Sequence, residues 1–131
     1  MEKQFRCAFA TNNYDATIDF YKNGLGFTIV ESWNRSDDDK GTLFKAASGI
    51  IEVVKRSVTQ DHDDWENDTP SGFTIVIELE DVDDYFRDVS SKGVSIFEGL
   101  DDQKWGHRSF RVVDPNRVNL YFFTETARTK K

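Results

Sequence analysis

The sequence predicts an α+β fold made of two tandem modules, each with the order strand, helix, strand, strand, strand. Three observations lead to this prediction. The same order of hydrophobic patterns occurs twice within 131 residues. The two halves share few identical residues, so what repeats is the order of the secondary-structure elements. Matching features also lie 67 to 69 residues apart, in the pairs Arg6 and Thr74, Gly26 and Gly93, and Glu52 and Tyr121. A near-constant offset is typical of a duplicated supersecondary unit.

The first module covers about residues 3–56. Large and small side chains alternate over residues 4–11, which is the period of a strand. A helix is expected over residues 14–23, because Asn12 and Asn13 offer capping side chains and Gly24 ends the apolar spacing. A charged turn is expected at residues 34–41. Three further strands complete the module, over residues 27–33, 42–47 and 50–55.

An acidic linker at about residues 57–70 precedes the second module, at about residues 71–126. Residues 73–79 predict a strand. Asp81 then caps a helix with apolar residues at i, i+3, i+4 and i+7, and Gly93 ends it. The remaining strands are expected at residues 94–98, 109–113 and 118–124. The last two form a hairpin, because Asp114-Pro115-Asn116-Arg117 supplies turn residues in the required order.

Composition narrows the class of protein. With 37% apolar and 14% aromatic residues, 1–131 is expected to be a single domain with a substantial core. The net charge of −7 argues against nucleic acid as a partner and favours a neutral or cationic small molecule. A membrane partner is not expected, because no apolar run reaches the length of a spanning helix. With no signal-peptide pattern and a single Cys, the predicted location is the cytoplasm.

Several short motifs together resemble the glyoxalase/bleomycin resistance protein/dioxygenase superfamily, also called the vicinal oxygen chelate proteins. They occur in the order expected for that family, and the resemblance covers nearly the whole chain. It implies that the two βαβββ modules form a curled mixed sheet around a cleft, and that the protein forms a homodimer. The motifs are residues 16–21, 24–27 and 51–53, Trp105-Gly106 with Arg108, and Asp114-Pro115.

In enzymes of that family four inward-facing strand positions hold a divalent metal. The resemblance places them at Arg6, Glu52, Thr74 and Tyr121. Only Glu52 is a good ligand, since a guanidinium stays protonated and Thr and Tyr hydroxyls are poor ligands. The prediction is therefore no metal and no cofactor at this site.

These four positions still offer binding chemistry. Arg6 and Glu52 are expected on neighbouring strands, close enough for an ion pair. Two interpretations stay open: a structural ion pair that fills a lost metal site, or an Arg6 that is left partly free to bind a ligand carboxylate or carbonyl while Glu52 orients it. Tyr121 is either a hydrogen-bond donor to the same ligand or an ordinary core tyrosine. Thr74 completes the predicted ligand-binding set on these strands.

Trp105, Gly106, His107 and Arg108 form an unusual group at the start of the final hairpin. Trp105 is a candidate to stack on a planar ligand or, alternatively, to pack as a lid. Arg108 is included among the ligand-binding candidates, although it can instead hold the loop through carbonyl groups. His107 and Glu52 are the weak catalytic candidates. His62 is read as a solvated linker residue, while Trp33 and Trp65 border charged segments and can cover either a cleft or a dimer contact.

Three functions remain open at this point. The first is a metal-independent protein that binds a small, planar or cationic molecule, similar to family members that sequester antibiotics. The second is a metal-dependent lyase or dioxygenase, in which a metal polarises adjacent substrate oxygens. The third is a dimeric scaffold whose cleft is plugged by its own side chains. Whether the protein is an enzyme stays open, with binding favoured because most metal-ligand positions are lost.

Overall fold

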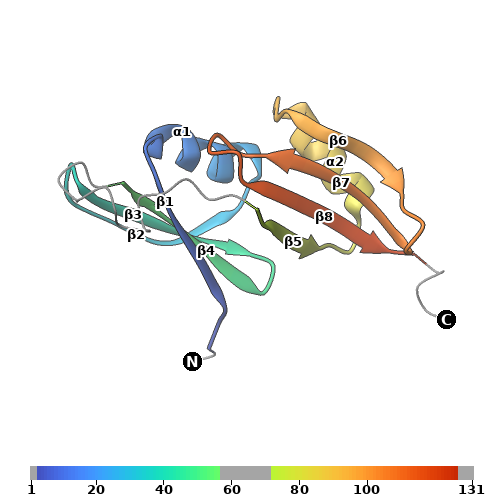
Figure 1. The fold of residues 1–131 in the computed structure, drawn as a ribbon, viewed down its shortest axis with the longest axis horizontal. Helices are drawn as coiled ribbons and strands as arrows, with labels where there is room; N and C mark the ends of the chain where they lie inside the picture. The colour runs from blue at the N-terminus through green and yellow to red at the C-terminus, as the bar shows by residue number, and fades with distance from the viewer. Residues whose placement is uncertain (1–2, 57–71, 127–131) are drawn as a thin grey trace.

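The structure is a computed structural model that describes residues 3–56 and 72–126. These residues form two four-stranded mixed sheets with the strand orders β1-β4-β3-β2 and β5-β8-β7-β6 (Figure 1). The predicted α+β fold with two βαβββ repeats is confirmed. The elements are β1 (Arg6–Thr11), α1 (Tyr14–Asp19), η1 (Phe20–Gly24), β2 (Thr28–Ser36), β3 (Asp39–Ala46), β4 (Gly49–Lys55), β5 (Thr74–Glu78), α2 (Val82–Ser91), β6 (Ile96–Asp102), β7 (His107–Val113) and β8 (Asn119–Glu125).

Strand register explains the constant offset seen in the sequence. In the first sheet β1 runs parallel to β4, and Ala8 lies opposite Glu52. In the second sheet β5 runs parallel to β8, and Val76 lies opposite Tyr121. Glu52 and Tyr121 therefore occupy equivalent places in the two repeats. Because strand side chains alternate between faces, each shares a face with its neighbour opposite.

The predicted turn at residues 34–41 is wrong in extent, because β2 continues to Ser36 and β3 already begins at Asp39. Cross-strand contacts stabilise the longer hairpin. The Trp33 ring lies over Gly41, and its Nε1 donates to Asp39 Oδ1 at 3.1 Å. The Arg35 Nε also donates to Asp39 Oδ2 at 2.8 Å. Arg35 and Asp39 thus pair across the hairpin, and the turn is confined to residues 37 and 38.

The first helix differs from expectation in its geometry. Residues 14–24 do form a helical segment that ends at Gly24, but its second half is a π-helix. Asn13 occupies the N-cap position without a side-chain capping bond. Instead the Thr17 hydroxyl donates to the Asn13 carbonyl at 2.7 Å. The second helix agrees with prediction, since Asp81 accepts a hydrogen bond from the Asp84 amide at 3.0 Å.

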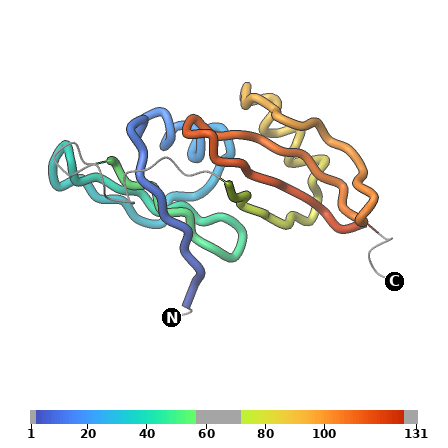
Figure 2. The backbone as a smooth tube through the Cα atoms, in the orientation of Figure 1, coloured from blue at the N-terminus to red at the C-terminus, as the bar shows by residue number. Residues whose placement is uncertain are grey.

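A single apolar cluster joins the two modules. Tyr21 of η1 packs against Phe44 of β3, while Tyr85 of α2 packs against Phe122 of β8. Polar contacts also cross the junction: the Tyr85 hydroxyl donates to the Leu25 carbonyl at 2.6 Å. The β7–β8 turn reaches back to α1, where Asn116 Nδ2 donates to Thr17 Oγ1 at 3.0 Å. The modules therefore lie side by side with a shared core (Figure 2).

The two sheets remain separate, which refines the curled sheet that the family resemblance implied. The outer edges of β1 and β5 each lack a strand partner among the described residues. None of the described helices has the length and hydropathy that a membrane crossing requires. The linker at residues 57–70, with His62 and Trp65, lies outside the described residues, and the cytoplasmic location stays a prediction.

Candidate functional site

Three of the predicted site residues meet on the second sheet, on the face opposite α2. Trp105 precedes β7, His107 begins β7, and Tyr121 lies on the adjacent strand β8. The His107 Nδ1 and the Tyr121 hydroxyl are 3.0 Å apart. The Trp105 Nε1 lies 3.2 Å from each of these two atoms. The structure thus brings together an indole, an imidazole and a phenol that are up to sixteen residues apart in sequence.

Donor and acceptor chemistry orders this network. An indole N–H can only donate, so the imidazole Nδ1 and the phenol oxygen serve as its acceptors. In the tautomer that leaves Nδ1 unprotonated, this nitrogen accepts from the Tyr121 hydroxyl. Trp105 remains 54% exposed above a Tyr121 that is 7% exposed. The result is an aromatic surface of mutually tilted rings, with the indole at 75° to the imidazole, whose base is held by hydrogen bonds.

Two further residues belong to this surface and were missed in the sequence. The Phe123 ring stacks on His107 with centroids 3.8 Å apart. The Arg111 guanidinium lies 4.7 Å from the Tyr121 ring centroid, and its Nε donates to Glu98 Oε1 at 2.9 Å. Strand alternation could have identified both residues. Arg111 is four residues after His107 and Phe123 is two residues after Tyr121, and an even spacing along a strand puts side chains on the same face. We call Trp105, His107, Arg111, Tyr121 and Phe123 the aromatic platform.

Arg108 is directed to the opposite side of the sheet. Its Nε donates to Asp83 Oδ1 of α2 at 2.8 Å, and a second nitrogen donates to Asp102 Oδ1 at 3.3 Å. The Arg108 guanidinium lowers the pKa of the Asp83 carboxyl through this hydrogen bond. Arg108 therefore links α2 to β6 and β7. This agrees with the prediction that it holds the loop in place, but its acceptors are carboxylates and not carbonyl groups. Its predicted role in ligand binding stays untested and is not supported by this position.

Arg6 and Glu52 form the expected ion pair on the first sheet. Arg6 Nη1 lies 3.2 Å from Glu52 Oε1, with side chains 54% and 20% exposed. The contact is a single one, so the remaining guanidinium N–H groups of Arg6 have no partner within the described parts of the chain. A pair this exposed contributes about 0–1 kcal/mol to folding. The geometry leaves both interpretations of the pair open, since Arg6 is bonded to Glu52 and yet accessible.

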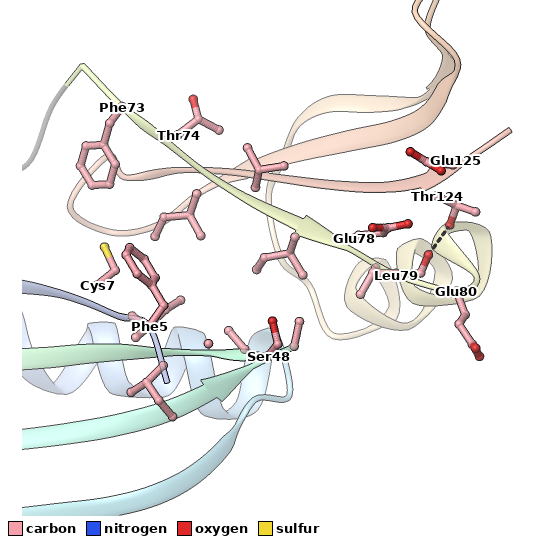
Figure 3. Close-up of a pocket in the computed structure, with 18 residues that line it drawn as sticks. Phe5, Cys7, Ser48, Phe73, Thr74, Glu78, Leu79, Glu80, Thr124 and Glu125 are labelled. Atoms are coloured by element: carbon pink, nitrogen blue, oxygen red, sulfur yellow. Dashed lines mark hydrogen bonds between the residues drawn. The ribbon is translucent and has the colours of Figure 1, made fainter. Parts of the chain in front are cut away.

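The four family positions do not meet within one chain. Arg6 and Glu52 lie on the first sheet, while Thr74 and Tyr121 lie on the second. A groove of about 990 Å³ separates the edges of β1 and β5, with Phe5 and Cys7 on one side and Phe73 on the other (Figure 3). Thr74 lines this groove, but Arg6, Glu52 and Tyr121 do not. Glu52 and His107, the catalytic candidates, likewise lie on different sheets.

The residues at these positions do not fit a divalent metal. Glu52 is the only carboxylate of the four and is already paired with Arg6. The Tyr121 oxygen is engaged by His107 and Trp105. Within residues 3–56 and 72–126 no group of three or more His, Cys, Asp or Glu side chains is arranged to hold an ion. Metal chemistry would need donors of that kind.

Comparison with known proteins identifies the family. The sequence model of the Glyoxalase/Bleomycin resistance protein/Dioxygenase superfamily matches residues 3–122. The chain belongs to this superfamily. It is also 28% identical over 127 residues to the uncharacterized protein YraH of Bacillus subtilis (strain 168), covering 91% of this chain and 97% of YraH. The resemblance found in the sequence is therefore confirmed.

Solved structures of the superfamily fold agree with this assignment. TioX from Micromonospora sp. ML1 superimposes with a TM-score of 0.74 at 18% identity, covering 95% of this chain and 99% of TioX. TnmS3, an antibiotic binding protein from Streptomyces sp. CB03234, superimposes with a TM-score of 0.70 at 16% identity, covering 96% and 98% of the two chains. At these identities the superpositions establish the fold alone.

Proposed function

We propose that the protein binds a small, planar or cationic molecule without a metal ion, on the aromatic platform of the second sheet. The observation that carries this proposal is the hydrogen-bonded group of Trp105, His107 and Tyr121, which presents a half-exposed indole on a fixed base. Aromatic rings favour flat ligands, and they attract cations through their faces. The net charge of −7 also favours a cation. An antibiotic-binding role of the kind that TnmS3 has is consistent with this chemistry.

A metal-dependent lyase or dioxygenase is the second candidate. It is favoured only by membership of the superfamily, since Glu52 is the sole strong ligand among the four positions. Elemental analysis of the purified protein separates the two candidates. Stoichiometric nickel, zinc or iron would contradict the binding proposal. A scaffold with a plugged cleft, the third candidate, would bind no small molecule at all.

Substitution of Trp105 tests the binding site. A thermal-shift screen of planar amines and amino-sugar antibiotics should reveal a ligand, because a ligand at 100 times its Kd stabilises the fold by about 2.7 kcal/mol. Trp105→Ala is expected to weaken its binding about tenfold, as the stacking surface is lost. Trp105→Phe keeps a ring and should retain most of the affinity. Equal affinity of the wild type and Trp105→Ala would contradict the proposal.

We further propose that the protein is a homodimer in which the first sheet of one chain faces the second sheet of its partner. Such a pairing would unite Arg6 and Glu52 with the aromatic platform, which a single chain keeps on separate sheets. Exposed apolar side chains support an interface. They are Phe5, Val30, Phe73, Val76, Phe97 and Trp105.

Mixing two inactive variants tests this shared site. Arg6→Ala and Tyr121→Ala should each lower ligand affinity as pure proteins, because every site lacks one group. Co-refolding them in equal amounts should restore wild-type affinity in about a quarter of the sites, since half of the dimers are mixed and each has one intact site. No recovery, or a monomer in sedimentation measurements, would contradict the shared site. The Trp105 experiment remains informative in either case.

A further inference from the structure

A small pocket lies away from the aromatic platform, where β1, the end of β4 and the β7–β8 turn come together. Its volume is about 210 Å³. Two arginines, Arg56 and Arg117, line it, and the described lining residues include no carboxylate. In a chain with a net charge of −7, this is a locally basic site. The lining residues are Ala10, Thr11, Asn12, Asn13, Arg56, Pro115, Asn116 and Arg117.

Arg56 contributes an unsatisfied donor. Its backbone N–H donates to the Thr11 carbonyl at 2.8 Å, which continues the ladder between β1 and β4 and fixes the start of the side chain. Its Nε atom is buried and has no hydrogen-bond partner among the described residues. Buried polar atoms are nearly always bonded, because leaving one unpaired is costly. An acceptor placed in this pocket would satisfy it.

Arg117 contributes a second cation from the other module. It adopts a left-handed backbone conformation with φ 69°, and its N–H donates to the Asp114 carbonyl at 2.9 Å. The exposed side chain forms no ion pair within the described residues. Asp114, in the same turn, directs its carboxylate to four other donors: the Asn116 and Val118 amides, the Tyr21 hydroxyl and the Asn116 side chain.

The floor of the pocket is held in place by hydrogen bonds. The Asn116 Oδ1 accepts from the Thr11 hydroxyl, and its Nδ2 donates to Thr17 Oγ1 at 3.0 Å. Asn13 also lines this pocket, and its side-chain amide makes no capping hydrogen bond. A fixed floor with two arginines and spare amide donors is suited to accept negative charge.

We propose that this pocket binds a small oxyanion, either a phosphate or a carboxylate group. Guanidinium groups match the planar and tetrahedral geometry of such oxygens and remain charged at all physiological pH values. The volume lies below the roughly 300–1,000 Å³ of pockets for drug-sized ligands. It equals on the order of seven water molecules at ~30 Å³ each, enough for one hydrated ion or acidic head group. The bound ion bridges the two modules, and this site is independent of the aromatic platform.

Titration of the full chain with inorganic phosphate tests the proposal. At constant ionic strength, with chloride as the reference, phosphate should produce saturable amide NMR shifts at Asn12, Asn13 and Arg117 and a higher melting temperature. Acetate forms a second arm, so that saturation by one anion identifies phosphate or carboxylate chemistry. Arg56→Gln and Arg117→Gln should each weaken binding at least about tenfold, because each removes a charged donor.

Arg35→Gln is the matched control. It removes the same charge from an exposed hairpin residue that pairs with Asp39 outside the pocket, and it should leave the affinity unchanged. The proposal is overturned if neither anion saturates the wild type, or if Arg35→Gln weakens binding as much as Arg117→Gln. Because Arg117 is exposed, its variant provides the test even if Arg56→Gln fails to fold.

Discussion

Replacing Asp114 with Ala is expected to lower the free energy of unfolding by about 3–5 kcal/mol. Asp114 is 4% exposed and Tyr21 is fully buried. The carboxylate accepts the Tyr21 hydroxyl at 2.8 Å and the Asn116 and Val118 amides at 2.7 and 2.8 Å. Ala leaves a buried phenol and two turn amides without an acceptor. Urea unfolding at neutral pH measures the change.

Two controls separate these contributions. Tyr21→Phe removes only the hydroxyl and should cost about 1 kcal/mol. Asp114→Asn keeps one oxygen acceptor for the turn amides and should fall between Tyr21→Phe and Asp114→Ala. In the Tyr21→Phe background, Asp114→Ala should lower the free energy of unfolding by less than it does in the wild type. The reason is that no buried phenol is then left without an acceptor. A loss below about 1 kcal/mol for Asp114→Ala would contradict the assigned role.

Stability is expected to fall steeply above about pH 10, the usual pKa of tyrosine. Burial raises the pKa of Tyr21 well above its ordinary value, with further contributions from the charge and hydrogen bond of Asp114. Burial likewise raises the pKa of Tyr85, assisted by the charge of Asp88. The unfolded chain therefore loses phenol protons at a pH where the folded chain retains them. Since the unfolded state then binds fewer protons, unfolding becomes more favourable as the pH rises.

The expected slope is about 1.4 kcal/mol per pH unit for each buried tyrosine, or about 2.7 kcal/mol for the two together. Stability from these groups is fully present below the unfolded pKa and is lost as the pH rises toward the folded values. Urea unfolding at a series of pH values from about 8 to about 11 measures the slope. Tyr85→Phe should halve it. A flat profile above about pH 10 would rule out the explanation, and so would phenolate absorbance near that pH in the folded protein that Tyr21→Phe or Tyr85→Phe removes.

Much of the fold could be predicted because its patterns are local. The strand alternation, the helix ends at Gly24 and Gly93 and the turn residues at 114–117 are each readable within about ten residues. The Arg6 and Glu52 pair was also predictable, because strand parity puts both residues on one face. The longer β2–β3 hairpin was not, since contacts between Trp33, Gly41 and Asp39 outweigh the turn-like composition.

The sequence by itself determined the family, the duplication and the absence of good metal donors at three of four strand positions, since these depend on residue type and spacing. Apart from the Arg6 and Glu52 pair, only the tertiary structure decided where side chains meet. It turned Arg108 toward α2, joined Trp105 to Tyr121, and set Tyr21 against Asp114, 93 residues away. It also placed Arg56 and Arg117 at one pocket. Such contacts depend on how strands, helices and modules pack, because side chains distant in sequence approach only when their supporting elements are fixed in space.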